Sequence, residues 1–260
     1  HSLRYVRCVG FNETFTDGRA FDKLSQLVDG TYQGIDAEGQ YGNDPYPVLD
    51  GTINLTTGAY RDTYDALMTH YPKLKLNIAK WWIRFEDPEV KRICVKNWDK
   101  DGDGELSMEE AAAVSSIGTV FIGKDSIENL DLTFLHNWER IDFTSVRDCK
   151  RLRRVVYPKS LRLVSGGLLM NCPAVEEIVI LSKDIRFIFG MVINGAPSLK
   201  RVILYAETPP ENTDKSAYFL WYTNKDTILY VPDKSVELYK KIPFYSKFAK
   251  AILPLSEYQG

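Results

Sequence analysis

Histidine and cysteine are scarce in this chain of 260 residues, which holds three of the first and four of the second. The histidines are His1, His70 and His136. The cysteines are Cys8, Cys94, Cys149 and Cys172. None of the histidines lies in a metal or nucleophile motif, and no two cysteines have the C-x-x-C spacing of zinc or thioredoxin-like sites. The sequence therefore gives no sign of zinc, thiol redox or histidine-based chemistry.

Other signatures are missing as well. The chain has no G-x-S-x-G, P-loop or dinucleotide-binding fingerprint, so we predict that it is not an enzyme. A carboxylate pair for glycoside cleavage would leave no trace in the sequence, because such pairs meet only in the fold. No apolar run approaches the length of a membrane span. The net charge of −2 gives no reason to expect nucleic-acid binding.

One stretch carries clear chemistry, and it reads DKDGDGELSMEE from Asp99 to Glu110. Oxygen ligands stand at alternate positions of a twelve-residue loop, as in the calcium loop of an EF-hand. The predicted ligands are the carboxylates of Asp99, Asp101 and Asp103, the backbone carbonyl of Glu105, Ser107 through a water, and both oxygens of Glu110. Gly104 supplies the positive φ that the sharp turn needs. The sequence predicts a Ca²⁺ site.

A plainer interpretation of the same stretch is an acidic turn. Ser107 and Glu110 form an S-x-x-E capping box ahead of an Ala-rich segment, and clusters of Asp and Gly are common in turns. The flanking pattern favours the metal loop, because helical periodicity precedes and follows it. We predict an incoming helix from Asp87-Pro88-Glu89 to Trp98 and an outgoing helix over residues 107–116.

Residues 1–85 are predicted to form an α/β unit that is repeat-like from residue 51. A short helix over residues 20–28 and a loop over residues 30–47 are expected first. Alternation over residues 52–55 and 74–78 predicts two strands, joined by a helix over residues 60–71. The two strands are expected to be parallel, since a helix connects them.

Internal repetition is the main signal beyond residue 118. The stretch Cys172-Pro-Ala-Val-Glu-Glu-Ile-Val-Ile180 aligns with Cys149 to Tyr157 before it and with Ala196 to Leu204 after it. The shift is 23 in the first case and 24 in the second. The segment 161–164 aligns with 185–188, and the segments 127–132 and 138–143 have the pattern of shorter coils. This period is typical of leucine-rich repeats, whose strands stack into a parallel sheet.

Stacking predicts a ladder of charges across successive coils. The variable positions hold Glu139-Arg140, Arg153-Arg154, Glu176-Glu177 and Lys200-Arg201. Over the last three coils the sign alternates, so neighbouring strands should form ion pairs. The basic run at residues 147–162 could be taken for a polyanion site, but Arg153 and Arg154 should be largely neutralised by Glu176 and Glu177, which favours the structural interpretation.

Further side chains have both a structural and a functional interpretation. Cys149 and Cys172 occupy equivalent repeat positions, where we expect buried free thiols rather than a disulfide. Trp81, Trp82, Trp221 and Tyr222 are the candidates for stacking on a glycan, although core or cap packing explains such aromatics more often.

The predicted organisation has four parts. Residues 1–85 form the α/β unit, 86–118 the helix-loop-helix calcium motif, 119–204 the leucine-rich repeats, and 205–260 a C-terminal cap. The cap follows a break at Thr208-Pro209-Pro210 and contains a last strand over residues 227–232 and a helix from Ser235. The fold class is α/β, a leucine-rich-repeat solenoid with a parallel sheet.

Residues 86–255 resemble the BspA-like leucine-rich repeat proteins of bacterial cell surfaces. The likeness lies in the repeated C-x-x-L-x-x-I-x-L register, the T-P-P break, and the closing Y-V-P-x-x-S-V-E-x-Y-K stretch from Tyr230 to Lys240. The stretch from Val90 to Val114 is similar to a segment that precedes the repeats in members from gut anaerobes. The resemblance implies a secreted or lipid-anchored surface protein that serves in adhesion or binding, and it transfers no catalytic residue.

The sequence as a whole predicts a calcium-binding surface protein that binds an unidentified protein or glycan and in which calcium is structural. The alternative is a structural spacer of a larger surface protein, with no ligand of its own. A dockerin-like module fits less well, because dockerins carry two such loops and one is found here.

Overall fold

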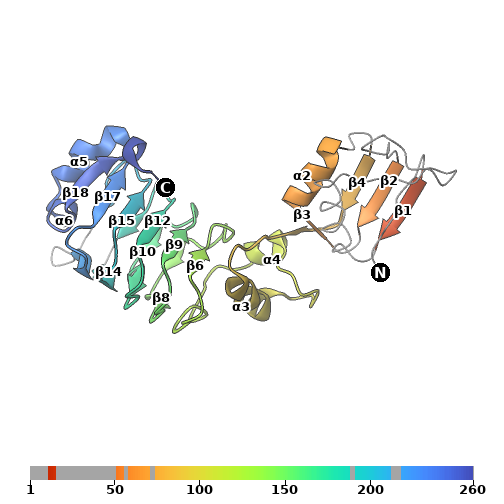
Figure 1. Cartoon of the computed structure of the whole chain (residues 1–260), viewed down its shortest axis with the longest axis horizontal. Coiled ribbons are helices and arrows are strands. Elements are labelled where there is room, and N and C mark those ends of the chain that lie inside the picture. Colours follow the sequence, from red (N-terminus) through yellow and green to blue (C-terminus); the bar gives the residue numbers. More distant parts are fainter. Residues whose placement is uncertain are drawn as a thin grey trace, which may run out of the picture. The chain divides into compact units, whose positions relative to one another are not determined.

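The computed structural model describes residues 11–15, 51–55, 58–70, 74–187, 191–211 and 218–259. The protein is an α/β structure with mostly parallel strands (Figure 1). It divides into a first unit, His1–Arg84 with Asp99–Glu109, and a second unit, Phe85–Trp98 with Glu110–Gly260. In the described segments, no helix has the length and apolarity needed to cross a membrane. The predicted division at residues 85, 118 and 204 stays a prediction.

The first unit contains the predicted strand-helix-strand segment. Strands β1 (Phe11–Phe15), β2 (Gly51–Leu55) and β4 (Leu74–Ile78) form a parallel sheet in the order β1-β2-β4. Helix α2 (Arg61–His70) connects β2 to β4, so the predicted parallel pair is confirmed. A second pair, β3 (Ala59–Tyr60) with β5 (Trp81–Trp82), is also parallel. The expected helix at 20–28 and loop at 30–47 lie outside the described residues.

Helices flank the acidic loop, as predicted. Helix α3 (Pro88–Trp98) begins at Asp87, whose Oδ1 accepts hydrogen bonds from the backbone N–H of Glu89 at 2.8 Å and Val90 at 3.3 Å. The outgoing helix α4 (Met108–Ala112) is shorter than the predicted span to residue 116. Its last turn tightens, because Val114 N–H donates to the carbonyl of Ala111, three residues back.

From residue 129 to residue 204 the chain passes in turn through three parallel sheets of the second unit. The six-stranded sheet contains β6 (Asn129–Asp131), β9 (Arg154–Tyr157), β12 (Glu177–Ile180), β15 (Arg201–Leu204), β17 (Ile228–Val231) and β18 (Ala251–Pro254). The three-stranded sheet contains β7 (Arg140–Ile141), β10 (Leu163–Val164) and β13 (Arg186–Phe187). The four-stranded sheet contains β8 (Val146–Arg147), β11 (Leu169–Met170), β14 (Met191–Ala196) and β16 (Tyr218–Thr223).

Strand register confirms the main repeat alignment. Val155 pairs with Ile178, a shift of 23, and Ile178 pairs with Val202, a shift of 24. These are the shifts that the sequence predicts. The side chains of Val155, Ile178 and Val202 are fully buried, so neighbouring strands contribute apolar residues side by side to the core.

Two finer alignments were wrong. Leu163 pairs with Arg186, a shift of 23, whereas the predicted match of 161–164 to 185–188 requires 24. The segment 138–143 is not a coil equivalent to 127–132, because β7 belongs to the three-stranded sheet and β6 to the six-stranded one. The spacing between these segments is about half of the repeat period, so the second segment forms the next side of the same turn.

The predicted charge ladder is present over the last three coils. Glu176 contacts Arg153 (3.3 Å) and Lys200 (2.6 Å). Glu177 lies between Arg154 and Arg201, at 2.8 Å from each, and its side chain is almost fully buried. Glu139-Arg140 falls on the other sheet and takes no part in this ladder. Burial raises the pKa of Glu177, but hydrogen bonds from the two guanidinium groups and Tyr258 outweigh it, and the net shift is downward.

The C-terminal part closes the six-stranded sheet and covers its outer face. Strand β18, which the sequence analysis did not predict, pairs with β17, and η1 (Asp233–Ser235), α5 (Val236–Lys240) and α6 (Pro243–Ser246) precede it. Short helix η2 (Leu255–Glu257) follows. Leu255 and Tyr258 pack on an apolar outer column, Val156, Val179, Ile203 and Tyr230. The Tyr258 hydroxyl also donates to Glu177 at 2.9 Å.

A residue in the left-handed conformation recurs at a corner of the chain, at or near the ends of the strands of the four-stranded sheet. Successive turns place Gly123, Asp148, Asn171, Gly195 and Tyr222 there, all with φ between 48° and 71°. A Cβ on Gly195 would lie only 3.0 Å from the backbone of Asn171, so the stacked turns approach closely at this point. Asn171 Nδ2 also donates to Asp148 Oδ1 at 2.7 Å. Cys149 and Cys172 follow this corner as buried free thiols, as predicted.

The corner column predicts opposite effects for two substitutions. Asn171→Ala should lower the free energy of unfolding by about 1–2 kcal/mol, because alanine tolerates a positive φ poorly and the hydrogen bond to Asp148 is lost. Tyr222→Asn should raise it by about 0.5–1 kcal/mol, because Asn accepts this conformation more readily than an aromatic residue. Urea unfolding monitored by circular dichroism measures both, and equal effects of the same sign would contradict this account.

Candidate metal centre

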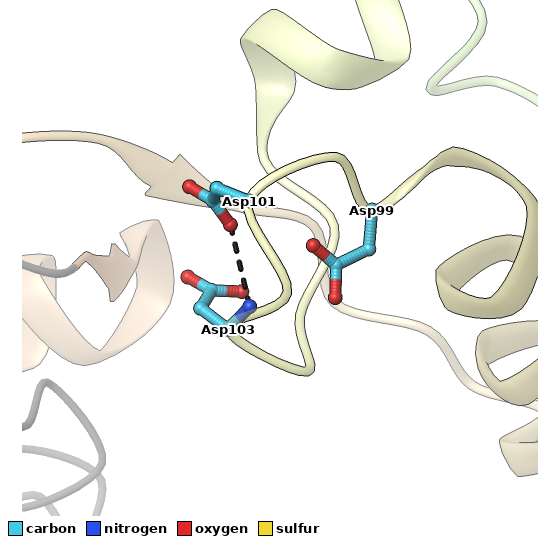
Figure 2. A group of neighbouring side chains, drawn as sticks. All are labelled: Asp99, Asp101 and Asp103. Atoms are coloured by element: carbon cyan, nitrogen blue, oxygen red, sulfur yellow. Dashed lines mark hydrogen bonds between the residues drawn. The ribbon is translucent and has the colours of Figure 1, made fainter.

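The acidic loop brings three predicted ligands together. Oxygens of Asp99, Asp101 and Asp103 all lie within 4.8 Å of one another. Figure 2 shows Asp101 and Asp103 side by side, with the carboxylate of Asp99 facing them across the loop. Carboxylate oxygens are the ligands that hard divalent cations prefer, so this group could hold a metal ion.

Hydrogen bonds within the loop set the positions of these carboxylates. The two oxygens of Asp99 accept from the N–H of Gly102 (2.7 Å) and of Gly104 (3.0 Å). Asp101 accepts from Asp103 N–H (3.3 Å), and Asp103 accepts from Glu105 N–H (2.9 Å). Each carboxylate therefore stabilises a tight turn of the backbone that follows it. A carboxylate has enough lone pairs to accept such bonds and to bind a cation as well.

Glycine allows the tight curvature of this loop. Gly104 has a φ of +83°, as its position in the motif predicts, and Gly102 has a φ of +74°. Residues with a Cβ adopt such angles only at a cost of about 1–2 kcal/mol. The three aspartates converge because Gly102 and Gly104 adopt the positive φ angles that the tight turn requires.

The loop is also paired with β5 of the same unit. Trp82 forms an antiparallel bridge with Ser107, and Ile83 N–H donates to the carbonyl of Leu106 at 2.8 Å. Leu106 is fully buried and so anchors this half of the loop in the apolar core. The second half of the loop is thus held by main-chain hydrogen bonds rather than by side chains alone.

Glu105 and Ser107 are buried, and Glu110 lies half-buried in α4. The Glu105 carboxylate accepts a 2.5 Å hydrogen bond from the hydroxyl of Tyr60, which is itself buried. The side chain of Glu105 is therefore engaged with Tyr60. This contact is compatible with the predicted role of Glu105, which is to bind the metal through its backbone carbonyl. The acidic cluster itself consists of the three aspartates.

Two side chains that the sequence analysis did not assign to the site contact the aspartates. Trp82 Nε1 donates to Asp103 Oδ2 at 3.1 Å. Lys80 Nζ forms ion pairs with Asp103 Oδ2 at 2.5 Å and with Asp101 Oδ2. Both residues lie about twenty positions before the loop, so only the pairing of β5 with the loop brings them there. The run Lys80-Trp81-Trp82 was visible, but nothing in its pattern points to the loop.

The charges of this group depend on one another. Burial alone would lower the pKa of Lys80, but hydrogen bonds to Asp101 and Asp103 raise it above its ordinary value. The hydrogen bond from Lys80 in turn lowers the pKa of Asp101. The ion pair with Asp101 therefore stabilises the loop at pH values above the ordinary carboxyl pKa and is lost as the pH falls through the lowered one.

The predicted glycan-stacking aromatics divide into two groups. Trp82 is buried, and Trp81 packs edge-on against Tyr64, so both serve the structure of the first unit. In the second unit Tyr222 is 74% exposed, and its ring meets Trp221 at 75°. The rings of Trp221 and Tyr222 are therefore not coplanar and do not form a flat stacking platform.

The hydrogen bond from Trp82 to Asp103 can be tested with a matched pair of substitutions. Trp82→Phe should lower the free energy of unfolding of chelator-treated protein by about 1–3 kcal/mol, because a hydrogen bond to a carboxylate is lost. Trp81→Phe removes an indole N–H from the neighbouring, half-exposed position and should cost less. Urea unfolding in EDTA measures both values, and an equal loss in the two variants would assign the effect to packing alone.

The assignment of the site depends on its own residues and their geometry. No protein-family model matches the chain, and no curated protein matches it in sequence.

Proposed function

We propose that the chain is a calcium-binding leucine-rich-repeat protein of the bacterial cell surface, without enzymatic activity, in which calcium is structural. The observation that carries the calcium assignment is the convergence of Asp99, Asp101 and Asp103 within a twelve-residue loop. Ligand types at the first, third, fifth, seventh, ninth and twelfth positions match the spacing that calcium loops use. Glu110 is the proposed bidentate ligand at the twelfth position.

A structural role for calcium follows from the setting of the loop. Only one such loop is recognised in the sequence, whereas sensor loops usually work in pairs. Its second half is already fixed to β5 through Trp82 and Ile83. Extracellular calcium is abundant, and sites with dissociation constants of roughly 10⁻⁴ to 10⁻³ M fill there. A site of this kind adds stability continuously instead of switching.

The solenoid architecture is part of the same proposal. The regular register shifts between β9, β12 and β15 support it, as does the rotation of the chain through three parallel sheets. Each turn buries its apolar side chains only against neighbouring turns, which is the principle of leucine-rich repeats.

Two surfaces of the repeats bear on ligand binding. The outer face of the six-stranded sheet carries the neutralised charge ladder and is covered in part by Leu255 and Tyr258, so it is a poor binding face. The end of β16 is different, because Tyr222 combines a φ of +48° with a 74% exposed ring. A strained backbone that presents an aromatic side chain to solvent is a feature of binding sites. We therefore place the protein or glycan ligand at this edge of the cap.

The structural spacer remains the second candidate, and a specific observation favours it. The ladder residues Arg153, Arg154, Lys200 and Arg201 are paired within the fold, and the neighbouring apolar column is buried. A repeat array that closes its own faces in this way can separate other domains without contacting a ligand.

Calorimetric titration tests the calcium assignment. Metal-stripped protein should bind one Ca²⁺, and Glu110→Ala should lose most of this affinity because the proposed bidentate ligand is gone. With a dissociation constant of about 10 μM, calcium at about 1 mM would stabilise the fold by about 2.7 kcal/mol. Magnesium serves as the competing ion, and Glu109→Ala, which removes the adjacent exposed carboxylate, serves as the matched control. Absence of calcium heat and of a thermal shift would reduce the loop to an acidic capped turn.

An array of glycans and matrix proteins, probed with calcium-loaded protein, tests the binding edge. Binding should be lost in Tyr222→Asn, a variant expected to be at least as stable as the parent protein. Leu238→Asn is the matched control, because it replaces another exposed apolar side chain, on α5. Binding that survives Tyr222→Asn would place the ligand elsewhere, and a calcium-loaded protein that binds nothing on the array would favour the spacer.

A further inference from the structure

The side chain of Lys80 lies against the acidic cluster. Its ammonium group contacts Oδ2 of both Asp101 and Asp103, two of the three carboxylates in the acidic cluster. The Lys80 side chain is 17% exposed and that of Asp103 is 20% exposed, so this pair is shielded from solvent. An ordinary surface ion pair contributes little, but one that is largely desolvated and shared between two carboxylates contributes more.

Lys80 is therefore a cation that the fold itself supplies to the acidic cluster. Three aspartates within 4.8 Å of one another repel each other, and a positive charge between two of them relieves that repulsion. Trp82 Nε1 is the second donor to Asp103 Oδ2, and because the indole is neutral it adds no charge. The backbone N–H donors are neutral as well, and they contact Asp99 and the Oδ1 atoms of Asp101 and Asp103.

We propose that Lys80 is the internal counter-ion of this loop: it holds Asp101 and Asp103 when no metal is bound, and it must give up these contacts when calcium binds. The inference rests on the proposed calcium function and adds the residue that sets its affinity. Calcium has to compete with a full positive charge, which weakens binding.

The proposal predicts two effects of opposite sign for Lys80→Met. In EDTA the variant should melt at a lower temperature than the parent protein, because the aspartates lose their counter-ion. In calorimetry it should bind calcium roughly tenfold more tightly, because the competing charge is gone. Lys80→Arg keeps the charge and should bind calcium within about threefold of the parent value. Lys100→Met, which removes an exposed lysine at the second loop position, controls for net charge.

A wild-type measurement avoids dependence on any variant. The Nζ resonance of Lys80, followed by ¹⁵N nuclear magnetic resonance, should show slow proton exchange in EDTA and faster exchange in saturating calcium. If Lys80→Met does not fold, Lys80→Gln keeps a hydrogen-bond donor without the charge and gives the same calorimetric test.

The outcomes separate this inference from the calcium proposal. Calcium binding by the parent protein with unchanged or weaker binding by Lys80→Met would overturn the role of Lys80 and leave the calcium site intact. An Nζ signal that does not respond to calcium would do the same. No calcium binding by the parent protein would overturn the calcium site, and the role of Lys80 with it.

Discussion

The second unit depends on main-chain pairing between successive turns of the chain. Strands β9, β12 and β15 of the six-stranded sheet each pair with the equivalent strand of the next turn, and this regular spacing places like residues over like. The core columns, the charge ladder and the left-handed corners all follow from that single register. Glu177 can be nearly buried because the register sets an arginine on either side of it.

The conformation of the acidic loop in the first unit is fixed differently, by hydrogen bonds in local turns and by one neighbouring segment. The aspartates accept hydrogen bonds from amides two to five residues ahead of them. The pairing of Trp82 and Ile83 with the loop then fixes its second half. If calcium binds here, most of the cost of arranging its ligands has already been met by these contacts.

Sequence pattern predicted the features that arise from local spacing or strict repetition. The convergence of Asp99, Asp101 and Asp103, the positive φ of Gly104, the strand-helix-strand unit and the main repeat register belong to this class. It missed those that depend on distant segments, since nothing near Lys80 indicates that it meets Asp101, and nothing in β16 indicates that Tyr222 occupies a corner. The one-residue error at 161–164 arose because the buried positions Leu161 and Val164 are three apart, whereas the buried positions Ile185 and Phe187 are two apart. A residue count alone does not detect such a change.

The contact between Tyr258 and Glu177 spans 81 positions of the chain. During synthesis the amino-terminal segments leave the ribosome first, so Val156, Val179 and Ile203 emerge before Leu255 and Tyr258. The outer column therefore lacks the cover of Leu255 and Tyr258 until these residues have been made, and an unfinished chain presents an apolar strip to its neighbours. The time between the synthesis of Ile203 and that of Leu255 and Tyr258 therefore sets how long this apolar surface is exposed to aggregation.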